Sequence, residues 1–185
     1  MICYGSQLPG IPGSITLGDW KLVVESWTPP ATNMSSVEAV KSNTSYEITS
    51  LEPWHQISTS LRNVSGRGFY STKFSWPPVQ EGSEADGAIL DLGALTCLIR
   101  VSVNGHQLAP LDPTNPIADL RPYLVNGTND VDIILATTLG NSLGPVWEDL
   151  RTSGTPAFGP VPVVEDNGLV LPVTVKPYRI VTFAP

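Results

Sequence analysis

Short runs in which apolar and polar residues alternate are the feature that most constrains the fold of this chain. In residues 20–27, WKLVVESW, the side chains of Trp20, Leu22 and Val24 fall on one face of an extended strand, and Pro29-Pro30 closes the run. A period of two is typical of a strand that buries one face, whereas a helix repeats every 3.6 residues. This segment therefore predicts a half-buried β-strand.

The same pattern recurs along the chain, so the sequence predicts seven or eight strands separated by turn-rich loops. In residues 68–76, GFYSTKFSW, every second residue from Tyr70 to Trp76 faces inward. Pro172 and Pro177 favour an edge strand or a bend in the last segment, because proline cannot donate to a sheet ladder. The remaining predicted strands cover residues 46–51, 88–93, 97–105, 130–139 and 169–183, the last as one strand or two.

Composition supports the same fold class. Charged residues make up only 15% of the 185 residues, while 16 glycines and 18 prolines punctuate the chain, which argues against long helices. Two helical turns are expected at residues 34–42, and single turns at residues 117–124 and 147–153. The chain is therefore predicted to be all-β, a single antiparallel β-sandwich of the jelly-roll type over residues 1–185.

The charge and hydropathy patterns exclude two classes of partner. The net charge of −7 and the lack of a Lys/Arg cluster disfavour a nucleic-acid partner. No apolar run approaches the roughly 20 residues of a membrane span, so no membrane partner is expected. The opening MICYGSQLPG lacks the pattern of a signal peptide, and we expect the chain to be excised from, or C-terminal in, a larger protein.

Sequons and cysteines indicate an extracellular protein. Asn33, Asn43, Asn63 and Asn126 each begin an Asn-X-Ser/Thr sequon, and this density suggests a secreted glycoprotein of a fungus. Cys3 and Cys97 are the only cysteines. They allow one disulfide, worth about 4 kcal/mol on the chain-entropy model, and the alternative is two buried free thiols.

Several motifs in a fixed order resemble a known domain. SLRNVSGRGFYSTKFSWP, GAILDLG and IRVSVNGHQLAPL are followed by IADLRPYLVNGTNDVDIILATTLGN and GLVLPVTVKPY. Together they resemble the galactose-binding-like jelly-roll domain of β-galactosidases and glucuronidases. The resemblance is closest to that domain in fungal and bacterial α-L-rhamnosidase-like glycoside hydrolases, and it implies a scaffold for a plant-polysaccharide-degrading enzyme. In that superfamily the catalytic carboxylates lie on a separate barrel domain.

No catalytic or metal motif emerges from the residues themselves. No carboxylate pair sits in a recognisable glycosidase motif, no G-x-S-x-G is present, and two histidines without Cys/His spacing do not support zinc. No cofactor is expected. Since jelly-roll modules of this superfamily often carry one structural calcium, the sequence allows such an ion, with oxygen ligands from Asp19, Asp86, Glu165 and Asp166.

Aromatic residues in loops are the candidates for sugar binding, because a pyranose stacks its apolar face on a ring while polar groups fix its orientation. Trp20, Tyr70, Trp76 and Tyr178 are interpreted as core residues. The candidate sugar-binding residues are Trp147 with Glu148, Asp149 and Arg151, and Trp54 with His55.

Two functions of different class follow from this interpretation. The first is a non-catalytic carbohydrate-binding module, whose ligand would be a plant cell-wall glycan. The second is a structural domain that docks against a catalytic domain of the same enzyme and has no sugar ligand; it predicts an exposed apolar patch. A stand-alone small lectin or lyase is a third alternative.

Overall fold

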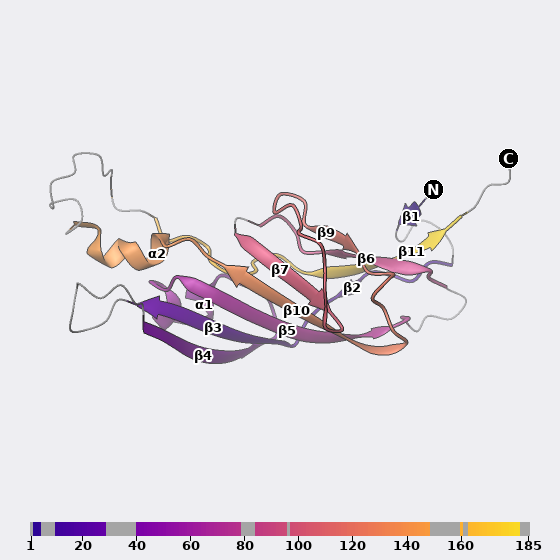
Figure 1. Cartoon of the computed structure of the whole chain (residues 1–185), viewed down its shortest axis with the longest axis horizontal. Coiled ribbons are helices and arrows are strands. Elements are labelled where there is room, and N and C mark those ends of the chain that lie inside the picture. Colours follow the sequence, from indigo (N-terminus) through magenta and orange to yellow (C-terminus); the bar gives the residue numbers. More distant parts are fainter. Residues whose placement is uncertain are drawn as a thin grey trace.

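The computed structural model describes residues 2–4, 10–28, 40–78, 84–95, 97–148, 160 and 163–181, with residues 2–4 described by their backbone alone. These residues form two antiparallel sheets packed face to face (Figure 1). The prediction of an all-β sandwich is confirmed. No helix in the described part of the chain is long and apolar enough to cross a bilayer.

The larger sheet has six strands in the order β4-β3-β5-β10-β7-β8. Its strands are β3 (Trp20–Thr28), β4 (Val40–Ile48), β5 (Gly66–Trp76), β7 (Leu98–Val103), β8 (His106–Gln107) and β10 (Gly127–Ala136). The smaller sheet has the order β1-β11-β6-β9, with β2 also paired to β11. Its strands are β1 (Ile2–Tyr4), β2 (Ile15–Thr16), β6 (Gly87–Asp91), β9 (Ile117–Asp119) and β11 (Thr174–Ile180).

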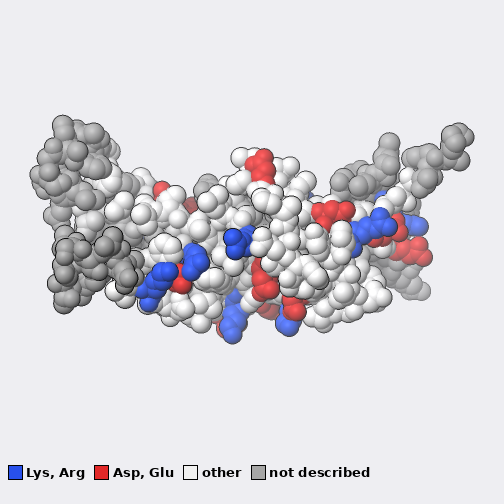
Figure 2. Space-filling view, viewed as in Figure 1, with Lys and Arg blue, Asp and Glu red and all other residues white. Residues whose placement is uncertain are grey.

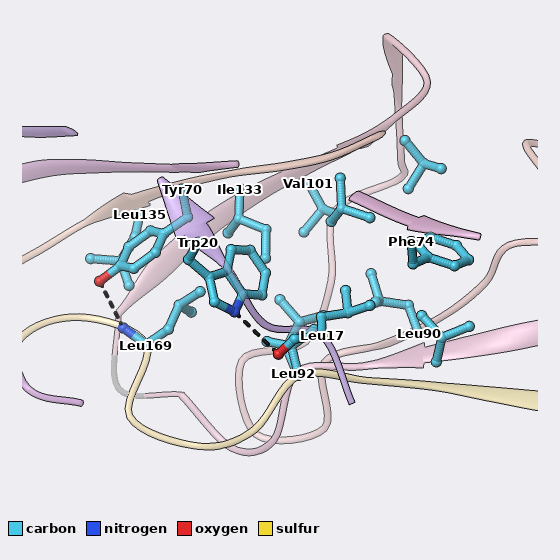
Figure 3. Close-up of a cluster of buried hydrophobic side chains, with 14 of the residues drawn as sticks. Leu17, Trp20, Tyr70, Phe74, Leu90, Leu92, Val101, Ile133, Leu135 and Leu169 are labelled. Atoms are coloured by element: carbon cyan, nitrogen blue, oxygen red, sulfur yellow. Dashed lines mark hydrogen bonds between the residues drawn. The ribbon is translucent and has the colours of Figure 1, made fainter. Parts of the chain in front are cut away.

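The predicted inner faces of the strands form the core. Trp20 and Leu22 of β3 and Ile133 of β10 are fully buried, as the alternation predicts. Trp20 and Tyr70 meet edge to face with ring centroids 6.2 Å apart, a favoured aromatic geometry. Figure 3 shows this cluster, in which Trp20 Nε1 donates to Leu17 O and Leu169 N donates to Tyr70 Oη. The interpretation of Trp20, Tyr70, Trp76 and Tyr178 as core residues is confirmed.

Local structure departs from the sequence expectation in three places. Residues 117–119 form β9 before the expected single turn, in which Leu124 N donates to Leu120 O at 3.1 Å. Residues 40–42 begin β4 in place of the end of a helical turn, and the rest of the 34–42 prediction falls outside the described residues. β11 is a central strand, since it pairs with β1, β2 and β6, but Pro177 itself is paired only with Ala88 of β6 among the described residues. The proline therefore lies where one side of a central strand has no ladder partner.

Short helical turns close one end of the sandwich. They are α1 (Trp54–Ile57), η1 (Thr59–Leu61), α2 (Gly140–Leu143) and η2 (Gly144–Val146). In Figure 1 α2 extends beyond the strands, at the end of the molecule opposite β1. We call this end of the molecule the loop end.

Candidate functional site

The loop end is held together by a buried asparagine. Asn141 of α2 donates from Nδ2 to the carbonyl of Glu165 at 2.9 Å, and its Oδ1 accepts the backbone N–H of Glu165 at 2.7 Å. The side chain is 4% exposed, so both of its polar groups need such partners. This reciprocal pair fixes the segment that follows β10 against the segment that precedes β11.

A small pocket opens beside this pair. It has a volume of about 340 Å³ and is lined by Cys97, Thr138, Glu165, Asp166, Asn167 and Gly168; we call it the loop-end pocket. Thr138 Oγ1 donates to Glu165 Oε2. His55 Nδ1 lies 3.8 Å from Asp166 Oδ1, and the His55 side chain is 24% exposed. The pocket therefore offers carboxylate groups to a polar ligand, and the His55 imidazole lies beside one of them.

Trp54 is not available to such a ligand. It is 1% exposed, and its Nε1 donates to Tyr70 Oη at 2.8 Å. It packs over Gly68 and Gly168, where an added Cβ would lie 2.7 Å from the indole. The sequence interpretation of Trp54 as a loop residue facing a sugar is corrected here: a pyranose cannot stack on an enclosed ring, and of the pair only His55 reaches the surface.

Trp147 and Glu148 are at the same end of the molecule. They are helical and directly follow η2, with Trp147 half-buried and Glu148 exposed. Asp149 and Arg151 fall outside the described residues. The structure thus brings Trp147 and His55, which are far apart in the sequence, to the loop end.

The predicted disulfide is not formed. Cys97 is a half-buried free thiol, and burial raises its pKa to about 11. Cys3 lies on β1, which pairs with the last residues of β11. In Figure 1 β1 lies at the far end of the molecule from the loop end.

The sequon asparagines that the structure describes are exposed, and one of the proposed calcium ligands already accepts a hydrogen bond. Asn43, Asn63 and Asn126 are exposed, and Asn33 falls outside the described residues. Asp86 Oδ2 accepts the N–H of Ile180 at 2.6 Å, far along the chain from Glu165 and Asp166. Among the described residues no three His, Cys, Asp or Glu side chains gather into a metal site.

A second hollow lies on the outer face of the six-stranded sheet. It has a volume of about 610 Å³ and crosses β3, β5 and β10, with Asp19, Lys21, Ser71, Lys73, Asp130 and Asp132 in its lining. Figure 2 shows both acidic and basic side chains over these strands. Sequence reasoning identified Ser71 and Lys73 as outward-facing but did not assign them a site. The register that aligns them with β3 and β10 is a long-range property, which alternation does not reveal.

Comparison with known proteins places the fold. No family model matches the sequence, and no curated protein matches it. The structure is similar to part of a rhamnosidase from Novosphingobium sp. PP1Y, with a TM-score of 0.60 and 22% identity over 90% of this chain and 15% of that one. The chain has the fold of one part of such glycoside hydrolases.

A second solved structure agrees with the first. A β-glucuronidase from Faecalibacterium prausnitzii matches with a TM-score of 0.55 and 15% identity, covering 95% of this chain and 33% of that one. The chain thus spans 15% and 33% of the two enzymes. The resemblance to the jelly-roll domain of rhamnosidase-like and glucuronidase enzymes is confirmed at the level of the fold.

Proposed function

We propose that this chain is a non-catalytic ancillary module of a glycoside hydrolase and that it binds carbohydrate. The observation that supports this most directly is the match of nearly the whole chain to a small part of a rhamnosidase. A module of this kind raises the local concentration of an enzyme on its substrate. Weak affinity suffices because, once the module has bound, the catalytic domain in the same chain meets the substrate intramolecularly. The proposed ligand is a plant cell-wall glycan.

The loop-end pocket is the sugar site that the sequence candidates favour. Asp166 supplies an acceptor in its lining, His55 lies beside Asp166, and Trp147 supplies an aromatic surface at the same end of the molecule. Sugar hydroxyls are recognised by such combinations of charged groups and rings. We further propose that the protein is secreted and that Asn43, Asn63 and Asn126, all exposed, carry glycans.

The docking function has an observation of its own. Leu98 is 74% exposed and Val163 is 87% exposed, and Leu139 and Val146 are also exposed. These residues belong to segments that border the loop-end pocket or carry Trp147. A group of exposed apolar residues is typical of a surface that another domain covers, so the loop end is the proposed contact with a catalytic domain if it binds no sugar.

A glycan array tests the first function against the second. The chain is screened beside Trp147→Ala, with Leu98→Ala as the control for loss of apolar surface at the same end. Binding of the unmodified chain to any plant glycan supports the module, and a specific loss in Trp147→Ala places the sugar at the loop end. A silent array contradicts sugar binding and favours docking. Release of sugar from any arrayed glycan would contradict the non-catalytic assignment.

A further inference from the structure

The outer face of the six-stranded sheet carries a row of polar residues that runs across the strands. Ser71 of β5 is paired in register with Lys21 of β3 on one side and with Asp132 of β10 on the other. The row continues to Ser102 of β7, which is paired with Asp132. Since directly paired residues point to the same face, these side chains form one continuous polar row.

An apolar row lies immediately beside it. Phe69, two residues before Ser71, is paired with Val23 of β3 and with Ile134 of β10. All three residues are half-buried. A hollow of about 400 Å³ spans the two rows, with Lys21, Val23, Phe69, Ser71, Asp132 and Ile134 in its lining. It shares Lys21, Ser71 and Asp132 with the 610 Å³ hollow, so the two form one groove with an apolar side and a polar side.

Lys21 and Asp132, in the middle of this groove, are unpaired within the described part of the chain, unlike Lys73 beside them. Lys73 Nζ forms an ion pair of 2.9 Å with Asp130. The side chains of Lys21, Ser71 and Asp132, by contrast, have no hydrogen-bond or ion-pair partner in the described part of the chain. Lys21 and Asp132 are two strands apart, roughly 10 Å between backbones. They therefore present a free donor and a free acceptor on either side of a hydroxyl.

The apolar side of the groove is in contact with a network of hydrogen-bonded side chains. Glu25 Oε1 accepts hydrogen bonds from Trp27 Nε1 at 2.7 Å and from Arg67 Nε at 2.9 Å. The Arg67 guanidinium in turn lies 5.4 Å from the ring centroid of Phe69, within the range of a cation–π contact. A ring fixed in this way loses little conformational freedom when a ligand stacks on it.

From this arrangement we propose a second carbohydrate site: the groove across β3, β5 and β10 binds an extended, neutral oligosaccharide. Its sugars stack their apolar faces on Phe69, Val23 and Ile134 and exchange hydroxyl hydrogen bonds with Lys21, Ser71 and Asp132. The length of a pyranose ring is comparable to the strand spacing of about 4.8 Å, so consecutive sugars lie over consecutive strands.

The charge of the groove selects a neutral chain. Asp19, Asp130 and Asp132 outnumber Lys21 and Lys73 in its lining, and the whole chain carries a net charge of −7. A polyuronate would meet this negative potential along its length. Hydroxyl groups, which both donate and accept, match a site that offers the ammonium of Lys21 and the carboxylates of Asp19 and Asp132.

This proposal rests on the proposed carbohydrate-binding function, and calorimetric titration of the full chain separates the two. The probes are cellohexaose, xylohexaose and a galactan-derived hexasaccharide, with hexagalacturonate as the anionic counterpart. Asp132→Ala and Phe69→Ala change the groove. Thr128→Ala, on the exposed end of the same strand β10, is the control for the first, and Ile117→Ala, at an exposed apolar residue of β9 in the smaller sheet, is the control for the second. Trp147→Ala is the separate test of the loop end.

The groove is supported if a neutral hexasaccharide binds, if each groove variant weakens binding roughly tenfold or more, and if both controls leave it unchanged. Amide shifts in the NMR spectrum on titration should then concentrate at residues 21–23, 69–73 and 130–134. Binding lost only in Trp147→Ala overturns the groove while sustaining the module. Binding of hexagalacturonate alone overturns the neutral ligand, and no binding by any probe overturns both proposals.

Discussion

Nδ2 of Asn104 donates a hydrogen bond of 2.8 Å to Oδ1 of Asn129, and this bond joins two tight turns that are distant in sequence. Asn129 is fully buried and also holds its own turn, because its Oδ1 accepts from Val125 N and its Nδ2 donates to Val125 O and Gly127 O. The β7–β8 turn at Asn104-Gly105 has positive φ at both residues, as a type I′ hairpin requires. The two turns at this end of β10 are thus fixed by one amide network.

We predict that Asn129→Ala lowers the free energy of unfolding by about 3 kcal/mol, because it leaves buried backbone groups of the turn without partners. Asn126→Ala, in the same turn but exposed, should change it by about 0.5 kcal/mol or less. Urea denaturation of both variants measures the difference. Equal effects at the two positions would show that the network does not stabilise the fold.

Tyr70→Phe should destabilise the core although it removes a single oxygen. Tyr70 Oη accepts from Trp54 Nε1 at 2.8 Å and from Leu169 N at 3.2 Å, and both donors would be left buried without an acceptor. We expect a loss of about 2 kcal/mol or more in the free energy of unfolding. Tyr46→Phe, at a half-buried tyrosine without such bonds, is the matched control and should be near neutral. Similar stability of the two variants would contradict the prediction.

The pair of Asp91 and Lys176 should make stability depend on acid pH. Lys176 Nζ donates to Asp91 Oδ2 at 2.6 Å, and Gly93 N donates to Oδ1 at 2.9 Å. These bonds hold the pKa of Asp91 below its usual value of 3.8. Because the folded pKa is lower than the unfolded one, the stabilisation is complete above the unfolded pKa and is lost as the pH falls through the folded pKa.

The measurement is the free energy of unfolding of Asp91→Asn and the unmodified chain against pH. Since both side chains are partly exposed, the difference at neutral pH should be about 1 kcal/mol or less, and it should shrink toward zero as Asp91 becomes protonated. Thr128→Ala, which removes no charge, should show no such pH-dependent difference. If the difference in the free energy of unfolding between Asp91→Asn and the unmodified chain grows in acid, it has the wrong sign and would refute the lowered pKa of Asp91.

Cys97 should react slowly with alkylating reagents. Burial raises its pKa from 9.0 to about 11, and only the thiolate reacts. In a Cys3→Ser variant near neutral pH, the folded protein should therefore alkylate roughly 100-fold more slowly than the unfolded chain, with a rate that rises as the pH rises. Mass spectrometry of the unreduced, unmodified chain is the check on its redox state, and an intramolecular disulfide there would contradict the free thiol.

The sequence predicted the strands with a buried face because alternation is a local signal. It could not predict Trp54, whose segment, bounded by Pro53, is typical of a loop. A single helical turn instead places the indole over Gly68 and Gly168, two glycines that are distant in sequence from each other. Their lack of a side chain is visible in the sequence, but the ring that fills the space is not.

The candidate sites, too, could be predicted from the sequence only in part. Outward positions such as Ser71 and Lys73 follow from the strand pattern, yet the groove depends on the register that sets Ser71 between Lys21 and Asp132. That register is fixed by pairing among three strands from different parts of the chain. At the loop end, Trp147 stays a candidate because of its loop segment and polar neighbours in the sequence. Asn141, which positions the pocket, gave no signal because its partners are backbone groups of Glu165.

The central position of β11 has a consequence for how the protein is made. This strand pairs with β1, β2 and β6, so three strands of the smaller sheet have no common partner until residues 174–180 have been synthesised. A nascent chain that has emerged only as far as β10 can assemble the six-stranded sheet, but it exposes the inner face of that sheet. Completion of the sandwich therefore waits until β11 has left the ribosome, and until then the exposed apolar face of the larger sheet is a surface through which nascent chains can aggregate.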